Sequence, residues 1–113
     1  MKLEGSCHCG SVHFSVLSDH PYPFNHCYCS ICRKTAGGGG FAINLGGNFE
    51  TLKVEGEEYI SVYQAIIKNS ETGETQESPG QRHFCNKCGS ALWQWNPIWP
   101  ELVHPFASAI DTD

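Results

Sequence analysis

Seven cysteines in 113 residues are the strongest constraint on what this chain can fold into. Four of them form two short pairs near opposite ends of the chain, in "CHCG" (7–10) and "CNKCG" (85–89). The other three are crowded into "CYCSIC" (27–32). An odd number leaves one thiol outside any set of disulfides, and a reducing compartment disfavours disulfides altogether. Metal binding is therefore the better interpretation of this pattern.

The composition predicts one globular domain over residues 1–113. Hydrophobic residues make up 40% of the chain and charged residues 17%, which suits a modest folded core. The net charge of −5 offers no basic surface to nucleic acid or to an anionic membrane. The opening "MKLEGSCHCG" lacks the apolar stretch of a signal peptide, and no later run approaches the roughly 20 residues of a membrane helix. We therefore expect a cytoplasmic protein with no nucleic-acid or membrane partner.

Alternating apolar residues predict a mainly β fold. "SVHFSV" (11–16) and "FAINL" (41–45) alternate apolar and polar side chains, as half-buried strands do. Turn signals such as "GGGG" (37–40) and "ESPGQ" (77–81) separate the apolar runs. One short helical turn is expected, around 30–36. The remaining strands are predicted at 51–56, 59–67, 82–85 and 91–95.

The two cysteine pairs together supply four thiolates, which is the ligand set of a closed structural zinc site. A Zn–S distance of about 2.3 Å holds sulfurs roughly 3.8 Å apart, and pairs with one or two intervening residues can meet that separation. A glycine follows each pair, and glycine tolerates the positive φ that directs backbone N–H groups at thiolates. One metal would then fasten the 11–16 strand beside the 91–95 strand. The predicted ligands are Cys7, Cys9, Cys85 and Cys88.

The segment "CYCSIC" contributes three further thiols, Cys27, Cys29 and Cys32. Three protein ligands and one open coordination position are typical of catalytic zinc, so the fourth position would receive a visiting ligand. The alternative is a closed structural site completed by His26 or by a distant histidine. Side chains that are adjacent in sequence, such as His26 and Cys27, rarely bind one tetrahedral ion with good geometry. This favours the open site.

The residues that follow this segment suit a thiol that bears carboxylates. Arg33 and Lys34 could hold such an anion, or they could be solvated surface charges. "TAGGGGF" (35–41) could bring backbone N–H groups to a ligand, or it could be a flexible turn. The remaining histidines, among them His83 and His104, have no motif partner and are expected to be structural or solvent-facing. The three tryptophans are expected to pack in the core and at its rim.

Four stretches of the chain resemble one known family. "CHCGSVHF", "HCYCSICRKTAG", "RHFCNKCGSALW" and "VHPFASAID" occur in the order found in the glutathione-dependent formaldehyde-activating enzyme family, which also contains centromere protein V. The resemblance covers almost the whole chain. It implies a β-tent fold of small antiparallel sheets, a structural zinc on the four paired cysteines, and a catalytic zinc on Cys27, Cys29 and Cys32.

The resemblance also implies an activity, the condensation of formaldehyde with glutathione to S-(hydroxymethyl)glutathione by a carbon–sulfur lyase. A thiol bound at the open zinc would be a thiolate near neutral pH, and binding would place it against formaldehyde. No side chain is a clear general acid for the new alkoxide, so water would serve. The alternative is a non-enzymatic zinc module that binds a protein partner or carries a thiol ligand. Family members usually continue beyond "FASAIDT", so a chain ending at Asp113 is either a short member or a fragment.

Overall fold

The computed structural model describes residues 1–19, 25–35, 42–68 and 71–112, and most of its elements are short strands. The strands in chain order are β1 (Lys2–Ser6), β2 (His13–Leu17), β3 (Asn25–Cys27), β4 (Ala42–Asn44), β5 (Gly47–Asn48), β6 (Lys53–Glu55), β7 (Ile60–Tyr63), β8 (Ile66–Lys68), β9 (Thr75–Glu77), β10 (Gln81–Cys85), β11 (Ala91–Trp95) and β12 (Leu102–Pro105). The helices are α1 (Ser30–Thr35) and three 3₁₀ turns, η1 (Phe49–Thr51), η2 (Glu57–Tyr59) and η3 (Ala107–Ala109).

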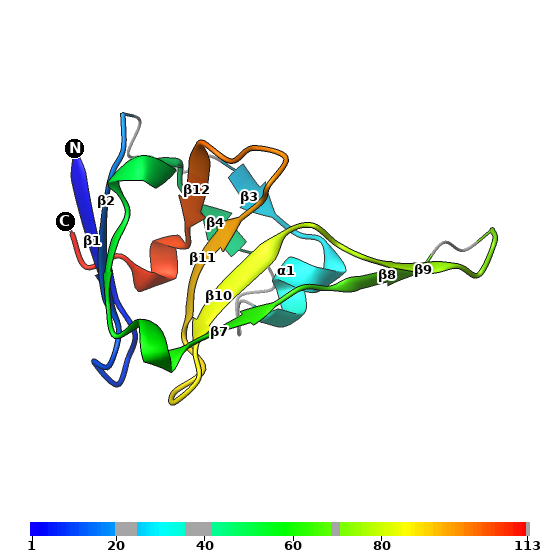
Figure 1. The fold of residues 1–113 in the computed structure, drawn as a ribbon, viewed down its shortest axis with the longest axis horizontal. Coiled ribbons are helices and arrows are strands. Elements are labelled where there is room, and N and C mark those ends of the chain that lie inside the picture. The colour runs from blue at the N-terminus through cyan, green and yellow to red at the C-terminus, as the bar shows by residue number, and fades with distance from the viewer. Residues whose placement is uncertain (20–24, 36–41, 69–70, 113) are drawn as a thin grey trace.

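The strands pair into small antiparallel sheets. One sheet has the order β1-β2-β6, a larger one has the order β5-β12-β11-β10-β7, and β3-β4 and β8-β9 form two separate pairs. Figure 1 shows the three-stranded sheet at one end of the molecule and the β8–β9 pair as an arm that projects from the other end. The prediction of a mainly β fold with small antiparallel sheets is confirmed. Within the described residues, no helix is long and apolar enough to cross a membrane.

The two larger sheets pack face to face around the hydrophobic core. Phe14 of β2 and Trp93 of β11 meet edge to face, with their ring centroids 5.1 Å apart, in the arrangement that aromatic pairs favour. Val12, Leu92 and Val103 are completely buried around them. The sequence placed the 11–16 and 91–95 strands beside one another. They do not pair edge to edge, because they lie in different sheets and contact one another across the core.

Several strands that the sequence did not predict carry weak apolar patterns. In β1 only Leu3 and Gly5 face inward, and Gly5 has no side chain that could mark the alternation. A Cβ at Gly5 would collide with the ring of Phe14, so close packing in the core requires glycine here.

The predicted 59–67 strand is divided into β7 and β8, since the two residues between them belong to neither strand.

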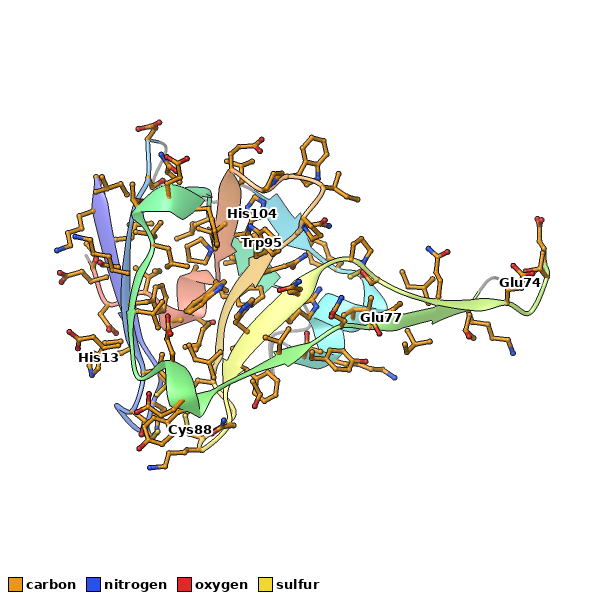
Figure 2. The ribbon with its side chains drawn as sticks, viewed as in Figure 1. His13, Glu74, Glu77, Cys88, Trp95 and His104 are labelled. Carbon is orange, nitrogen blue, oxygen red and sulfur yellow. The ribbon has the colours of Figure 1, made fainter. Side chains whose placement is uncertain are left out.

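The exposed arm was also unexpected. Ile66 and Ile67 of β8 are 62% and 44% exposed, although an apolar run predicts burial. Figure 2 shows Glu74 near the tip of this arm and Glu77 nearer to the body of the molecule. The apolar run therefore indicates a preference for strand structure, although its side chains are not part of the hydrophobic core.

Candidate metal centre

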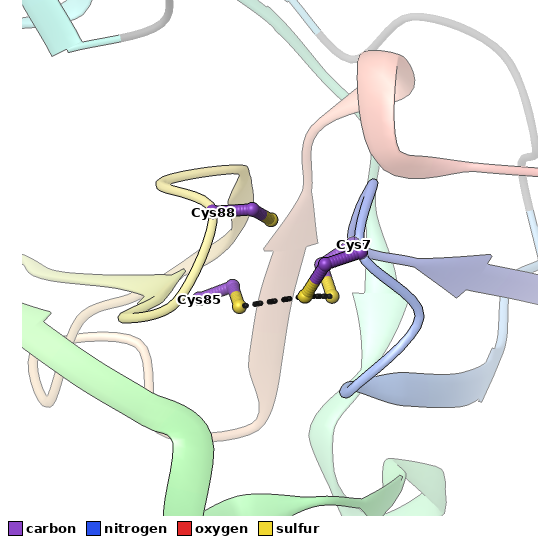
Figure 3. Close-up of side chains that lie close together, drawn as sticks. Cys7, Cys85 and Cys88 are labelled. Atoms are coloured by element: carbon purple, nitrogen blue, oxygen red, sulfur yellow. Dashed lines mark hydrogen bonds between the residues drawn. The ribbon is translucent and has the colours of Figure 1, made fainter.

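The four paired cysteines come together between two hairpins that are far apart in sequence. Cys7 and Cys9 lie between β1 and β2, whereas Cys85 ends β10 and Cys88 lies in the turn before β11. Their four sulfur atoms all lie within 4.8 Å of one another. Figure 3 shows the thiols of Cys7, Cys85 and Cys88 converging from the two turns. The structure therefore joins the three-stranded sheet to the five-stranded sheet at a group that could hold a metal ion.

The spacing of these sulfur atoms fits a tetrahedral metal. The Sγ atoms of Cys7 and Cys9 are 3.5 Å apart, and those of Cys9 and Cys85 are 3.7 Å apart. Tetrahedral zinc with Zn–S bonds of about 2.3 Å requires roughly 3.8 Å between sulfurs, which is far longer than a disulfide bond. The donor set and its geometry thus suit zinc as a structural ion.

Both turns depend on a glycine in a left-handed conformation. Gly10 has φ of +81° and Gly89 has φ of +79°, as the sequence predicted from the glycine after each pair. A Cβ at either position would meet no atom within 4 Å, so the constraint is backbone conformation and not space. The turn also brings the N–H of Val12 to 3.3 Å from the Cys7 sulfur. Such N–H donors stabilise a ligand thiolate.

Local hydrogen bonds and burial divide the four thiols into two kinds. Cys7 and Cys85 are buried, whereas Cys9 and Cys88 are exposed. Hydrogen bonds with the Ser90 hydroxyl and backbone lower the pKa of Cys88 to about 5, and those with Ser11 lower the pKa of Cys9. Burial raises the pKa of the Cys85 thiol to about 11. Cys9 and Cys88 are thus more easily ionised than an ordinary thiol, and a bound cation would favour ionisation of the other two.

The three remaining cysteines lie where β3 leads into α1. Cys27 ends β3, Cys29 lies in the intervening turn with an exposed side chain, and Cys32 is within α1. Arg33 and Lys34 follow in the same helix, and the Lys34 side chain is exposed. The side chains of Cys27, Cys32 and Arg33 lie outside the described part of the structure. The open three-cysteine zinc site and the two cationic contacts therefore stay predictions, as does a role for 36–41, which lies outside the described residues.

A cavity of about 320 Å³ adjoins the end of α1, and the sequence analysis did not anticipate it. Its walls come from α1, from β7, β10 and β11 of the five-stranded sheet, and from the residues just before β11 and just after β12. They are mainly apolar, with one arginine. The lining residues include Thr35, Tyr63, Arg82, Phe84, Ala91 and Phe106.

A comparison with protein families decides which family this chain belongs to. The family model described as glutathione-dependent formaldehyde-activating enzyme matches residues 2–112. The chain belongs to this family. The matched range contains all seven cysteines, and the resemblance seen in the four sequence stretches is confirmed.

Two similar proteins extend this comparison. A Halomonas elongata protein with the provisional name of glutathione-dependent formaldehyde-activating enzyme is 66% identical over 113 residues, which is 100% of this chain and 68% of that protein. A crystal structure of a Rhodobacter sphaeroides protein superposes with a TM-score of 0.65 at 23% identity, covering 100% of this chain and 90% of the other. The first protein supports the formaldehyde-activating enzyme family, and the second shows a shared fold.

Proposed function

We propose that this chain is a zinc-dependent carbon–sulfur lyase that condenses glutathione with formaldehyde to give S-(hydroxymethyl)glutathione. The observation that supports this most strongly is the family match over residues 2–112, because it spans both cysteine sets. In this proposal the protein is cytoplasmic, where glutathione is abundant and thiols stay reduced. It needs no nucleic-acid or membrane partner.

The two cysteine sets have different roles in this proposal. Cys7, Cys9, Cys85 and Cys88 hold a structural zinc, because four thiolates close the coordination sphere. Cys27, Cys29 and Cys32 hold the catalytic zinc, which when bound would keep a substrate thiol ionised near neutral pH. Exposure of Cys29 supports access of a substrate from solvent to this segment. Solvent at the same place can protonate the alkoxide that forms when sulfur attacks formaldehyde.

The rate of exchange between free glutathione and its formaldehyde adduct tests this function. The uncatalysed addition is facile, so the measurement needs an equilibrium mixture, in which magnetisation-exchange NMR gives the interconversion rate. Zinc-loaded protein should increase this rate in proportion to its concentration. A protein that binds glutathione but leaves the rate unchanged would instead be the non-enzymatic zinc module.

Fully loaded protein is expected to contain two zinc ions per chain, because the seven thiols divide into sets of four and three. Elemental analysis of protein purified anaerobically in the presence of zinc measures this number. Thiol counting before and after chelation is the control, since oxidised cysteines cannot bind metal. One zinc per chain in fully reduced, zinc-saturated protein would contradict the second site.

Substitution of Arg33 or Lys34 by glutamine is expected to raise the dissociation constant for glutathione by about ten- to a hundredfold, as loss of a charged hydrogen bond does. Binding of uncharged mercaptoethanol should change little. Titration calorimetry with both thiols measures the difference. Equal affinity for glutathione in all three proteins would mean that these side chains are solvated surface charges, a reading that the exposure of Lys34 allows.

A further inference from the structure

We infer that Arg82, at the wall of the apolar cavity beside α1, binds a carboxylate of the thiol substrate. This inference rests on the proposed function and specifies its substrate class, a thiol that carries a carboxylate. Arg33 and Lys34 are the nearest cations to the three cysteines in sequence, but Arg82 reaches the same helix through the fold. Glutathione has two carboxylates, so the two sets of cations do not exclude one another.

Strand pairing places Arg82 in the cavity wall. Arg82 lies opposite Tyr63 of β7, and Phe84 lies opposite Ala91 of β11. Side chains two residues apart in a strand share a face of the sheet, so Arg82 and Phe84 point to the same side. Together with Phe106, these residues line the cavity of about 320 Å³. That volume is at the lower end of the range for small-molecule sites, which suits part of a tripeptide.

A hydrogen bond links this wall directly to α1. The Nη1 atom of Arg82 donates to the Thr35 hydroxyl oxygen over 3.3 Å. That hydroxyl in turn donates to the Ile31 carbonyl oxygen over 2.7 Å, so Thr35 is held in place at the end of the helix. Cys32 lies one turn earlier in α1. The guanidinium is thereby fixed beside the helix that carries one of the predicted catalytic ligands.

The single positive charge in the cavity wall favours a ligand that carries a negative charge. Of the described residues that line the cavity, Arg82 alone carries a permanent charge. The neighbouring His83 also lines the cavity, but its ring stacks on Trp93 with ring centroids 5.0 Å apart, and burial lowers its pKa and favours its neutral form. A planar guanidinium matches a carboxylate in a bidentate manner. In a protein of net charge −5, an anionic thiol needs such a local cation.

The test compares glutathione with its diethyl ester, in which both carboxylates are blocked, on zinc-loaded wild type and on the Arg82→Met variant. Titration calorimetry measures both affinities. The substitution should weaken glutathione binding by about ten- to a hundredfold. Binding of the diester should not weaken. Arg82→Lys keeps a positive charge but lacks the planar guanidinium group. It should therefore lose less affinity for glutathione than Arg82→Met does.

Two control variants separate ligand binding from other effects of the substitution. Thr35→Val removes the hydrogen bond to Arg82 but keeps the guanidinium, so its loss of glutathione affinity should be smaller than that of Arg82→Met. Lys53→Met removes one positive charge from an exposed position in β6, in the other large sheet, and should leave binding unchanged. Circular dichroism of each variant verifies that the fold is kept.

Three outcomes would overturn the inference. Equal glutathione affinity of wild type and Arg82→Met would remove Arg82 from the site while leaving the proposed function intact. Equal losses for glutathione and its diester, reproduced by Thr35→Val, would assign Arg82 a role in holding α1. Wild-type protein that binds neither thiol would overturn both the proposed function and this inference.

Discussion

Replacement of Cys88 by serine is expected to unfold the domain or to lower its melting temperature strongly. The cysteine cluster joins the β1–β2 hairpin to the β10–β11 hairpin, so it closes a loop of most of the chain. Structural zinc contributes about 10–16 kcal/mol to the folding of zinc-finger peptides, whereas a whole domain is stable by only about 5–15 kcal/mol. The hydroxyl of serine is a far weaker zinc ligand than a thiolate, so the variant loses most of the metal's contribution.

Thermal unfolding followed by circular dichroism measures this effect, with metal content determined on the same samples. A chelator added to the wild type should produce the same destabilisation as the substitution, which ties the effect to metal and not to the side chain alone. Cys29→Ser is the matched control, because it makes the same chemical change at a cysteine outside this cluster. The structural and catalytic roles of the two zinc sites would be reversed if Cys88→Ser kept the melting temperature of the wild type while Cys29→Ser unfolded.

The sequence predicted the four-cysteine cluster because each half of it is local. The spacing within each pair and the glycine after it are set by a single turn, and both glycines have the expected positive φ. Under reducing conditions disulfides are disfavoured, so two turns that each carry a pair of cysteines indicate a metal site. Their meeting across the fold thus followed from chemistry alone, without knowledge of the strand pairing.

The cavity beside α1 could not be predicted in the same way, because it depends on contacts between distant segments. Arg82 reaches Thr35 because the fold brings the end of α1 beside β10, at the side chain of Arg82. Alternation within "QRHFC" could have put Arg82 and Phe84 on one face and His83 on the other. No local pattern, however, predicts which of these side chains lies beside the end of α1. Sequence reasoning therefore favoured Arg33 and Lys34, the cations nearest to the cysteines along the chain.

Replacement of Cys29 by serine is expected to abolish catalysis and zinc-dependent thiol binding while the fold is kept. Cys29 is exposed in the turn before α1 and lies outside the described four-cysteine group, so its loss removes no structural ligand of that group. A zinc site with two thiolates in place of three holds its metal weakly, and the thiol substrate then loses the ion that would ionise it.

Three measurements on Cys29→Ser make this prediction specific. The melting temperature should stay within a few degrees of the wild type, since a change of about 1 kcal/mol shifts a domain of this size by roughly 4–8 °C. Zinc content should fall from two ions per chain to one, and the exchange rate between glutathione and its formaldehyde adduct should return to the uncatalysed value. Tyr28→Phe, which alters the neighbouring exposed residue without removing a thiol, is the control and should keep both zinc ions. Normal exchange by Cys29→Ser protein with one zinc per chain would place the catalytic centre at the four-cysteine cluster instead.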